Sequence, residues 1–260
     1  MNKHHICVVL IALACTPALL TAQNTIGGKA VQVPEAEVAK QSAFLDAERE
    51  RLLGQYDKAI GLYKKFLYDN ERIDAAWYGL ARCQEAKEDM AAALESVQKA
   101  MTIDPANQWY AIYLGDLYEK SGRTKDAVRV YEGLVKRFPE TPEFYQQLAY
   151  LCVRSGDPQN GLKALEKLEK LAGITEQTAQ SRHLIYVGLR DYKKAAAELQ
   201  KLADAYPTEP QYRHRLAQFY ETTGEVAAAR RTYEDILRRY PEDPAARLAL
   251  AGNIAQKETR

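Results

Sequence analysis

The stretch QWYAIYLGDLYEKSGRTKDAVRVYEGLVKRFPET, residues 108–141, decides the fold because it holds one complete unit of a repeat. In its first half a large residue, Leu114, is followed by a small one, Gly115, and a second small residue, Ala127, comes thirteen positions after Leu114. A large residue fills the space between two helices, and a small one lets them approach closely. Gly122, between the two halves, is a residue at which helices end. The stretch therefore predicts two helices joined by a turn.

The same pattern recurs with a period of 34 residues. The small residues equivalent to Ala127 are Ala59, Ala93, Gly161, Ala195 and Ala229, and prolines near the ends of units are Pro105, Pro139, Pro207 and Pro241. A constant period without insertions is typical of stacked helical repeats, in which each unit packs only on its neighbours. We therefore predict six tandem units over residues 40–243, starting near Lys40, Asp74, Gln108, Pro142, Glu176 and Pro210.

The flanks of the array are predicted separately. Residues 23–39 are expected to form a linker and the beginning of the first helix, since Pro34 suits a helix start. Residues 244–260 are expected to form a capping helix or the first helix of a seventh unit. In the first unit, Asp46 and Glu50 stand where apolar residues belong, which is consistent with an exposed end of the array.

These columns resemble the tetratricopeptide repeat family, whose signature is a large-small pair, a central alanine and a closing proline at this period. The resemblance covers roughly Lys40 to Arg260 and implies an all-α fold, a right-handed superhelical solenoid of antiparallel helix pairs. The fifth unit departs from the signature. Arg182 and His183 occupy the large-small pair, and Gly173 replaces the closing proline. We therefore expect irregular helix packing there.

The resemblance also implies a function, because the family binds extended or helical peptides on a concave face lined by the first helix of each unit. The family's groove positions fall on Tyr78, Arg82, Glu85, Trp109, Ile112, Tyr113, Asp116, Glu119, Gln146, Tyr150, Val153, His214, Gln218 and Glu221. Aromatic residues with arginine nearby supply much of the energy of protein interfaces. The alternative for the aromatic residues is packing between units, since the chain has 17 tyrosines.

The predicted partner is a protein or peptide with a neutral or basic segment. The acidic groove residues Glu85, Asp116 and Glu119 would repel an acidic peptide. The 36 basic residues nearly balance the 35 acidic ones, so no overall field favours nucleic acid. His183 and His214 have no second histidine or cysteine at metal-ligand spacing, and no catalytic motif accompanies them. We therefore predict a binding protein, not an enzyme, without metal or cofactor.

The N-terminus predicts export. Lys3 precedes the apolar run Ile6 to Ala14, which is too short to span a membrane and is typical of a signal peptide. We expect residues 1–22 to be the signal peptide, with cleavage after Ala22. The mature chain is then expected to have no transmembrane span and to lie in the periplasm or cell envelope of a diderm bacterium.

A second interpretation rests on Cys15, which ends a degraded lipoprotein box. If Cys15 is lipidated, the chain is anchored to a membrane. The sequence thus favours an exported scaffold or adaptor that binds proteins through its groove. The alternative is a lipid-anchored structural subunit of an outer-membrane assembly or secretion complex.

Overall fold

A computed structural model describes residues 25–26, 29–30 and 34–258 of the chain, so the predicted signal peptide and Cys15 lie outside the described residues. The elements are β1 (Thr25–Ile26), β2 (Lys29–Ala30), α1 (Glu35–Leu52), α2 (Tyr56–Asp69), α3 (Asp74–Ala86), α4 (Met90–Ile103), α5 (Gln108–Lys120), α6 (Thr124–Arg137), α7 (Pro142–Arg154), α8 (Pro158–Ala172), α9 (Glu176–Gly188), α10 (Tyr192–Ala205), α11 (Pro210–Thr222), α12 (Val226–Arg239) and α13 (Pro244–Glu258). The strands β1 and β2 form a short antiparallel pair in which Thr25 lies opposite Ala30.

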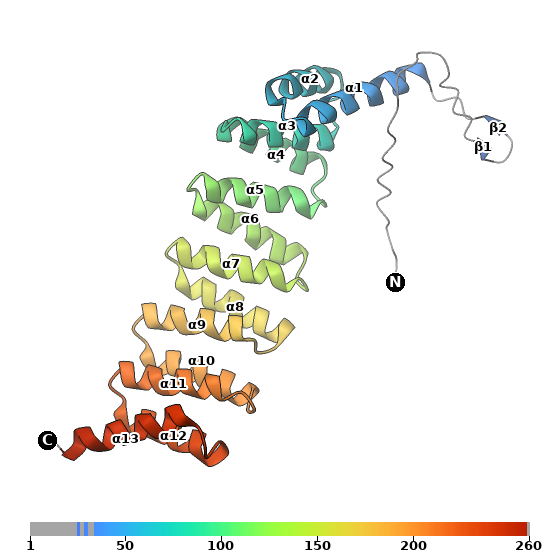
Figure 1. Ribbon diagram of the computed structural model, residues 1–260. Helices are drawn as coiled ribbons and strands as arrows, with labels where there is room; N and C mark the ends of the chain where they lie inside the picture. The colour runs from blue at the N-terminus through green and yellow to red at the C-terminus, as the bar shows by residue number, and fades with distance from the viewer. Residues whose placement is uncertain (1–24, 27–28, 31–33, 259–260) are drawn as a thin grey trace.

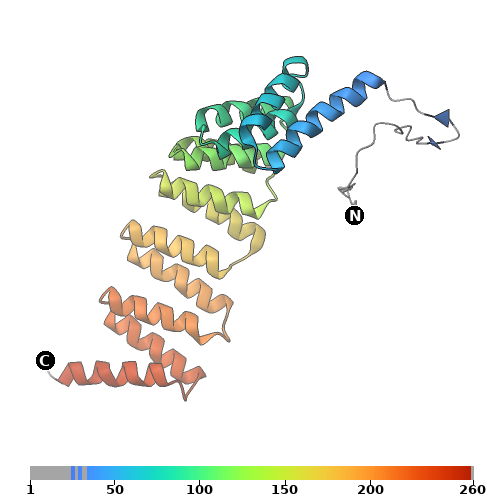
Figure 2. The same cartoon turned by 45° about the horizontal axis from the view of Figure 1, so that its top comes forward.

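The helices pack in consecutive pairs, each helix against the one before and the one after it. Figures 1 and 2 show the pairs stacked as an elongated ladder, with odd-numbered helices in one layer and even-numbered helices in the other. Helix α1, with 18 residues against 13 in α3, extends beyond the stack. The prediction of an all-α solenoid of helix pairs is confirmed.

Turns within the pairs use left-handed backbone conformations at the same repeat position. Gly122 has φ 70° and Gly156 φ 86°, and Glu88 and Arg190 take the same conformation with φ 63° and 58°. Only glycine adopts this conformation without a steric penalty. In two turns the packing of the neighbouring helices therefore holds a non-glycine residue in a conformation that its own preference does not favour.

The core lies between the two helix layers. The alanines Ala59, Ala93, Ala127, Ala195 and Ala229 are fully buried. A Cβ atom added to Gly115 would lie 2.7 Å from Cε2 of Tyr131, so α5 and α6 touch at a point where no side chain fits. The small residues of the repeat thus set the distance between paired helices, as their positions predict.

The first unit differs from the expectation of an exposed end. Asp46 is about half exposed, but only 4% of Glu50 is exposed. Its carboxylate is 3.1 Å from Lys58 Nζ and 3.2 Å from Arg49 Nη2. Glu50 is buried because these two cations replace the water that would otherwise solvate it.

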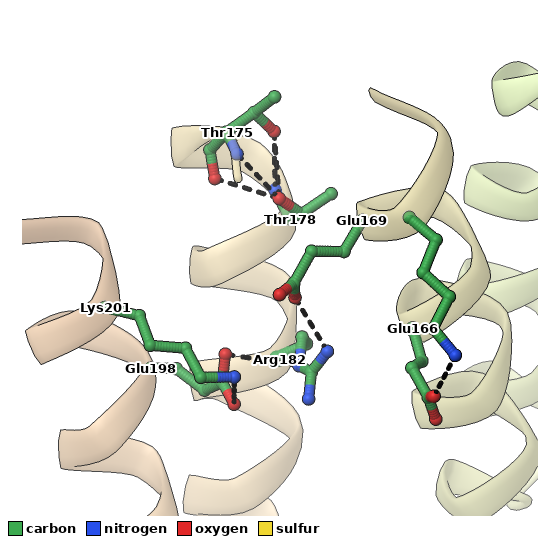
Figure 3. Close-up of polar contacts among 8 residues, drawn as sticks. Glu166, Glu169, Thr175, Thr178, Arg182, Glu198 and Lys201 are labelled. Carbon is green, nitrogen blue, oxygen red and sulfur yellow. Dashed lines mark hydrogen bonds and ion pairs between the residues drawn. The ribbon is translucent and has the colours of Figure 1, made fainter. Parts of the chain in front are cut away.

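The fifth unit contains a buried ionic cluster at its irregular pair (Figure 3). Arg182 of α9 donates from Nη1 to Glu169 of α8 at 2.9 Å, and its Nε lies 3.2 Å from Glu198 of α10. His183 packs edge-on against Phe219 with ring centroids 4.6 Å apart. A charged side chain therefore joins three helices at the position where the second, third, fourth and sixth units have a leucine.

Candidate protein-binding face

The odd-helix face is the surface presented by α3, α5, α7, α9 and α11. Its first feature is an aromatic cluster between α3 and α5. The ring of Tyr78 lies 5.2 Å from the rings of both Tyr110 and Tyr113. The Arg82 guanidinium lies 5.4 Å from the centre of the Tyr113 ring and donates to the Tyr78 hydroxyl at 3.2 Å. The structure thus brings Tyr78, Arg82 and Tyr113 together, as the sequence suggested, but only 9% of Tyr113 is exposed.

Glu85 joins this cluster to the next repeat. It accepts hydrogen bonds from the Tyr113 hydroxyl at 2.7 Å and from Lys120 Nζ at 2.6 Å. Burial alone would raise the pKa of this carboxyl, but the bonds from Lys120 and Tyr113 outweigh it, and the pKa is lowered. Glu85 is therefore ionised and already paired with a cation of its own chain.

The same arrangement recurs between α5 and α7. Arg154 forms an ion pair with Glu119, and Gln147 donates to the same carboxylate at 3.4 Å. The Arg154 guanidinium also lies 5.4 Å from the centre of the Tyr150 ring. We call the pairs Glu85–Lys120 and Glu119–Arg154 the two rungs of the odd-helix face. Each joins an acidic residue to a basic residue 35 positions later.

The remaining predicted groove residues are more scattered. Trp109 is 65% exposed at the start of α5, whereas Ile112 packs on the core and Asp116 is partly buried, which raises the pKa of its carboxyl. His214 lies farther along the array, and its Nε2 is 2.9 Å from Asp243 Oδ2. Since Glu85 and Glu119 are paired, they repel an acidic segment less than their number suggests. The preference for a neutral or basic partner stays a prediction.

A pocket of about 640 Å³ lies between α7 and α9, with Leu165 of α8 also among its lining residues. It includes Tyr150 and Val153, which the sequence placed on the groove, and Leu184, Ile185 and Leu189, which it did not. Leu184 is 59% exposed and Leu189 40%. The available signal was the run of apolar residues at the end of α9, which the poor match of the fifth unit obscured.

Within the described ranges, no group of histidine, cysteine, aspartate and glutamate residues is arranged to hold a metal ion. In the same part of the chain, no helix has the length and apolar character needed to cross a membrane.

The paired helices and their constant period define a helical repeat protein with an extended surface. More specifically, the chain belongs to the tetratricopeptide repeat family: family models described as tetratricopeptide repeat match residues 47–107, 85–149 and 186–252. The matched ranges leave out residues 150–185, which contain the irregular pair. Proteins of this family generally mediate protein–protein interactions, and their fold is an interaction scaffold, generally without catalytic activity.

Two curated relatives are similar to most of the array. A TPR repeat-containing protein of Methanocaldococcus jannaschii is 26% identical over 186 residues, which is 70% of this chain and 31% of the relative. Cellulose synthase operon protein C of Pseudomonas fluorescens is 26% identical over 164 residues, 60% of this chain and 13% of the relative. The chain thus spans less than a third of the length of either relative.

Solved structures share the fold. A tetratricopeptide repeat protein from Parabacteroides merdae superposes with a TM-score of 0.54 at 17% identity, covering 85% of this chain and 88% of that one. The MamA protein gives 0.54 at 19% identity, covering 67% and 96%. A chain of the Naa15/Naa10 structure bound to HypK-THB gives 0.62 at 15% identity, covering 85% of this chain and 35% of that one. At these identities the likeness concerns the fold alone.

Proposed function

We propose that this protein is an exported scaffold that binds a protein partner through the odd-helix face and catalyses no reaction. One observation carries the proposal: large apolar and aromatic side chains stand exposed on successive odd helices. They are Trp109 on α5, Tyr150 and Val153 on α7, and Leu184 on α9, with 65%, 49%, 41% and 59% of their surface exposed. Exposed apolar residues gathered on one face are typical of interaction surfaces.

Two further features support binding. The Tyr78, Arg82 and Tyr113 cluster is rigid, since its rings and guanidinium pack on one another, and rigid aromatic groups lose little entropy when a partner binds. The repeat scaffold places these groups at regular intervals along one surface, which suits an extended partner. Export is supported by the sequence of residues 1–22.

Site-specific photo-cross-linking in the native cell tests this function. A photoreactive residue is introduced at Trp109, at Leu184 or at Tyr68, an 83% exposed residue of α2 in the other helix layer. We expect a defined cross-linked partner from Trp109 or Leu184 in the exported fraction, and none from Tyr68. Cross-linking from Tyr68 alone, or a chain that stays in the cytoplasm, would contradict the proposal.

A second candidate is a lipid-anchored structural subunit of an outer-membrane complex. It is favoured by exposed apolar residues at the end of the array: Val38, Leu45 and Leu52 are 52%, 62% and 74% exposed and recur every seven residues on α1. Such spacing suits helix-to-helix contact. Mass spectrometry of the mature N-terminus separates the candidates, since the scaffold would begin at Gln23 and the anchored subunit at a lipidated Cys15.

A further inference from the structure

The rungs of the odd-helix face stop after the fourth unit. Glu119 on α5 is paired with Arg154 on α7, and the equivalent positions one repeat later are Val153 on α7 and Gly188 on α9. Gln147, which bonds Glu119, is replaced by Ser181. Val153, Ser181 and Gly188 carry no charge, so no third rung crosses the face. The pocket between α7 and α9 occupies this place, and it is lined by Val153, Gly188 and Ser181.

The contact between α8 and α9, behind the pocket, is also filled by smaller side chains than the equivalent contact between α6 and α7. Between α6 and α7, one repeat earlier, Phe144 of α7 packs on Tyr131 and Phe138 of α6, with ring centroids 6.4 and 6.0 Å away. One repeat later the position of Phe144 is Thr178, and that of Phe138 is Ala172. Loss of these rings removes the volume that holds α9 against α8, while Arg182 turns away to Glu169 and Glu198 (Figure 3). The pocket therefore results from the smaller residues of the irregular fifth unit.

The chemistry of the pocket is uncharged. None of the described residues that line it is acidic or basic. Its apolar lining comes from Tyr150, Val153, Leu165, Leu184, Ile185 and Leu189. At about 640 Å³ it lies within the usual range for binding pockets, about 300–1,000 Å³, and takes more than one side chain. A charged group of an occupant would lose its water in this pocket and find no residue of opposite charge there.

Carboxamides lie beside the apolar lining. Gln146 of α7 and Gln177 of α9 are exposed, and neither side chain forms a hydrogen bond with another described residue. A carboxamide both donates and accepts, which matches the alternating N–H and C=O groups of an extended peptide. A lipid chain or another purely apolar ligand would form no hydrogen bonds with these amides.

We propose that the pocket between α7 and α9 binds an uncharged, extended peptide segment of a partner, which inserts bulky apolar side chains while Gln146 and Gln177 hold its main chain. This rests on the proposed function and adds the partner's chemistry and the position of its anchor. It moves the centre of binding away from the Tyr78 and Tyr113 cluster, whose polar groups are already bonded to one another.

The test uses the purified chain and a capped peptide of glycine and serine with two leucines at alternate positions. Binding is followed by calorimetry and by the methyl NMR signals of Leu184 and Ile185. We expect saturable binding, weaker by at least about tenfold when both leucines are replaced by serine or when aspartates flank them. Methylation of the main-chain nitrogens between the leucines should weaken it similarly.

The variant Val153→Glu/Gly188→Arg rebuilds a rung across the pocket. It should fold, since Val153 is 41% exposed and a Cβ on Gly188 meets no atom within 4 Å, and it should lose binding by at least about tenfold. Leu184→Glu, at a 59% exposed position, is a second variant in case the first is unstable. Tyr68→Ser on α2 is the matched control and should bind normally.

Binding that survives both pocket variants but is lost on Trp109→Ala would overturn this proposal and leave the proposed function standing. Binding to phospholipid vesicles in place of the peptide, or self-association of the chain that the pocket variants abolish, would also overturn it. If the peptide does not bind while Trp109 cross-links to a partner in the cell, the pocket proposal fails and the scaffold function is retained. If the peptide does not bind and neither Trp109 nor Leu184 cross-links to a partner, both are wrong.

Discussion

Lys120 of α5 places its Nζ 2.6 Å from Oε1 of Glu85 on α3, so a base of one repeat neutralises an acid of the repeat before it. Arg154 of α7 is paired with Glu119 of α5 in the same way. Partly exposed pairs of this kind contribute little net stability, because solvent screens them. Their main effect is on the surface: they neutralise Glu85 and Glu119 on the odd-helix face.

The first prediction concerns pH. The Glu85 pKa is lowered in the folded chain, so this group stabilises the fold above its unfolded pKa, and the stabilisation is lost as the pH falls through the folded pKa. Glu85→Gln should therefore reduce stability slightly at about pH 7 and reduce the difference in urea midpoint between about pH 7 and pH 3. The control is Glu71→Gln, an exposed carboxylate without an ion pair among the described residues. An unchanged pH dependence in Glu85→Gln would refute the assignment.

The second prediction concerns the contact of α5 with α6. Gly115→Ala places a Cβ 2.7 Å from Tyr131, so a side chain or a helix must shift, and we expect a loss of about 1–3 kcal/mol. Gly133→Ala, within α6, has no atom within 4 Å of the added carbon and should stabilise the helix by up to about 1 kcal/mol. Chemical denaturation followed by circular dichroism measures both. Equal effects would mean that the close approach is not rigid.

The third prediction concerns the buried cluster of the fifth unit. Arg182→Leu restores the leucine of the repeat but leaves Glu198, only 5% exposed, with Lys201 as its remaining cation. We expect a loss of about 3 kcal/mol. Arg182→Leu/Glu198→Ala, which copies Leu148 and Ala164 of the fourth unit, should recover most of it. A double variant as unstable as the single one would show that the cluster has another role.

The fourth prediction concerns the core of the array. Leu114 is 3% exposed, and Leu114→Ala should cost about 2–5 kcal/mol through the cavity it leaves. Because each unit packs only on its neighbours, amide hydrogen exchange should rise in α4–α7 before it rises at α12. Leu45→Ala, at a 62% exposed position of α1, should have little effect. Uniform loss of protection along the chain would contradict this.

The fifth prediction concerns the thiols. Cys83 and Cys152 are buried and free, and burial raises the pKa of each to about 11. Since the thiolate is the reactive form, neither should react with a thiol reagent in the folded chain at about pH 8. Both should react once urea unfolds the array. Rapid labelling of the folded chain would show that the helices around them open.

The sequence alone determined the periodic part of this protein. The pattern of Leu114, Gly115 and Ala127 recurs at fixed spacing because each contact between paired helices needs a large residue beside a small one. This requirement concerns residues within one repeat. Several of the groove residues could be placed for the same reason. Tyr78 and Arg82 are four residues apart on one helix, and Tyr113 is on the first helix of the next repeat. The turns at Glu88 and Arg190 have no glycine to mark them in the sequence, and only the period of the repeat indicates them.

Tertiary structure decided the features that depend on contacts between different helices. Glu50 is buried because Lys58 and Arg49 reach it, and Arg182 replaces a leucine because Glu169 and Glu198 come from two other helices. The pocket arises in the same way: Val153 and Gly188 are ordinary residues on their own helices, and the gap appears only when α7 and α9 are placed side by side. Periodicity predicts where helices pack, whereas charge pairing and unfilled volume depend on which side chains meet between them.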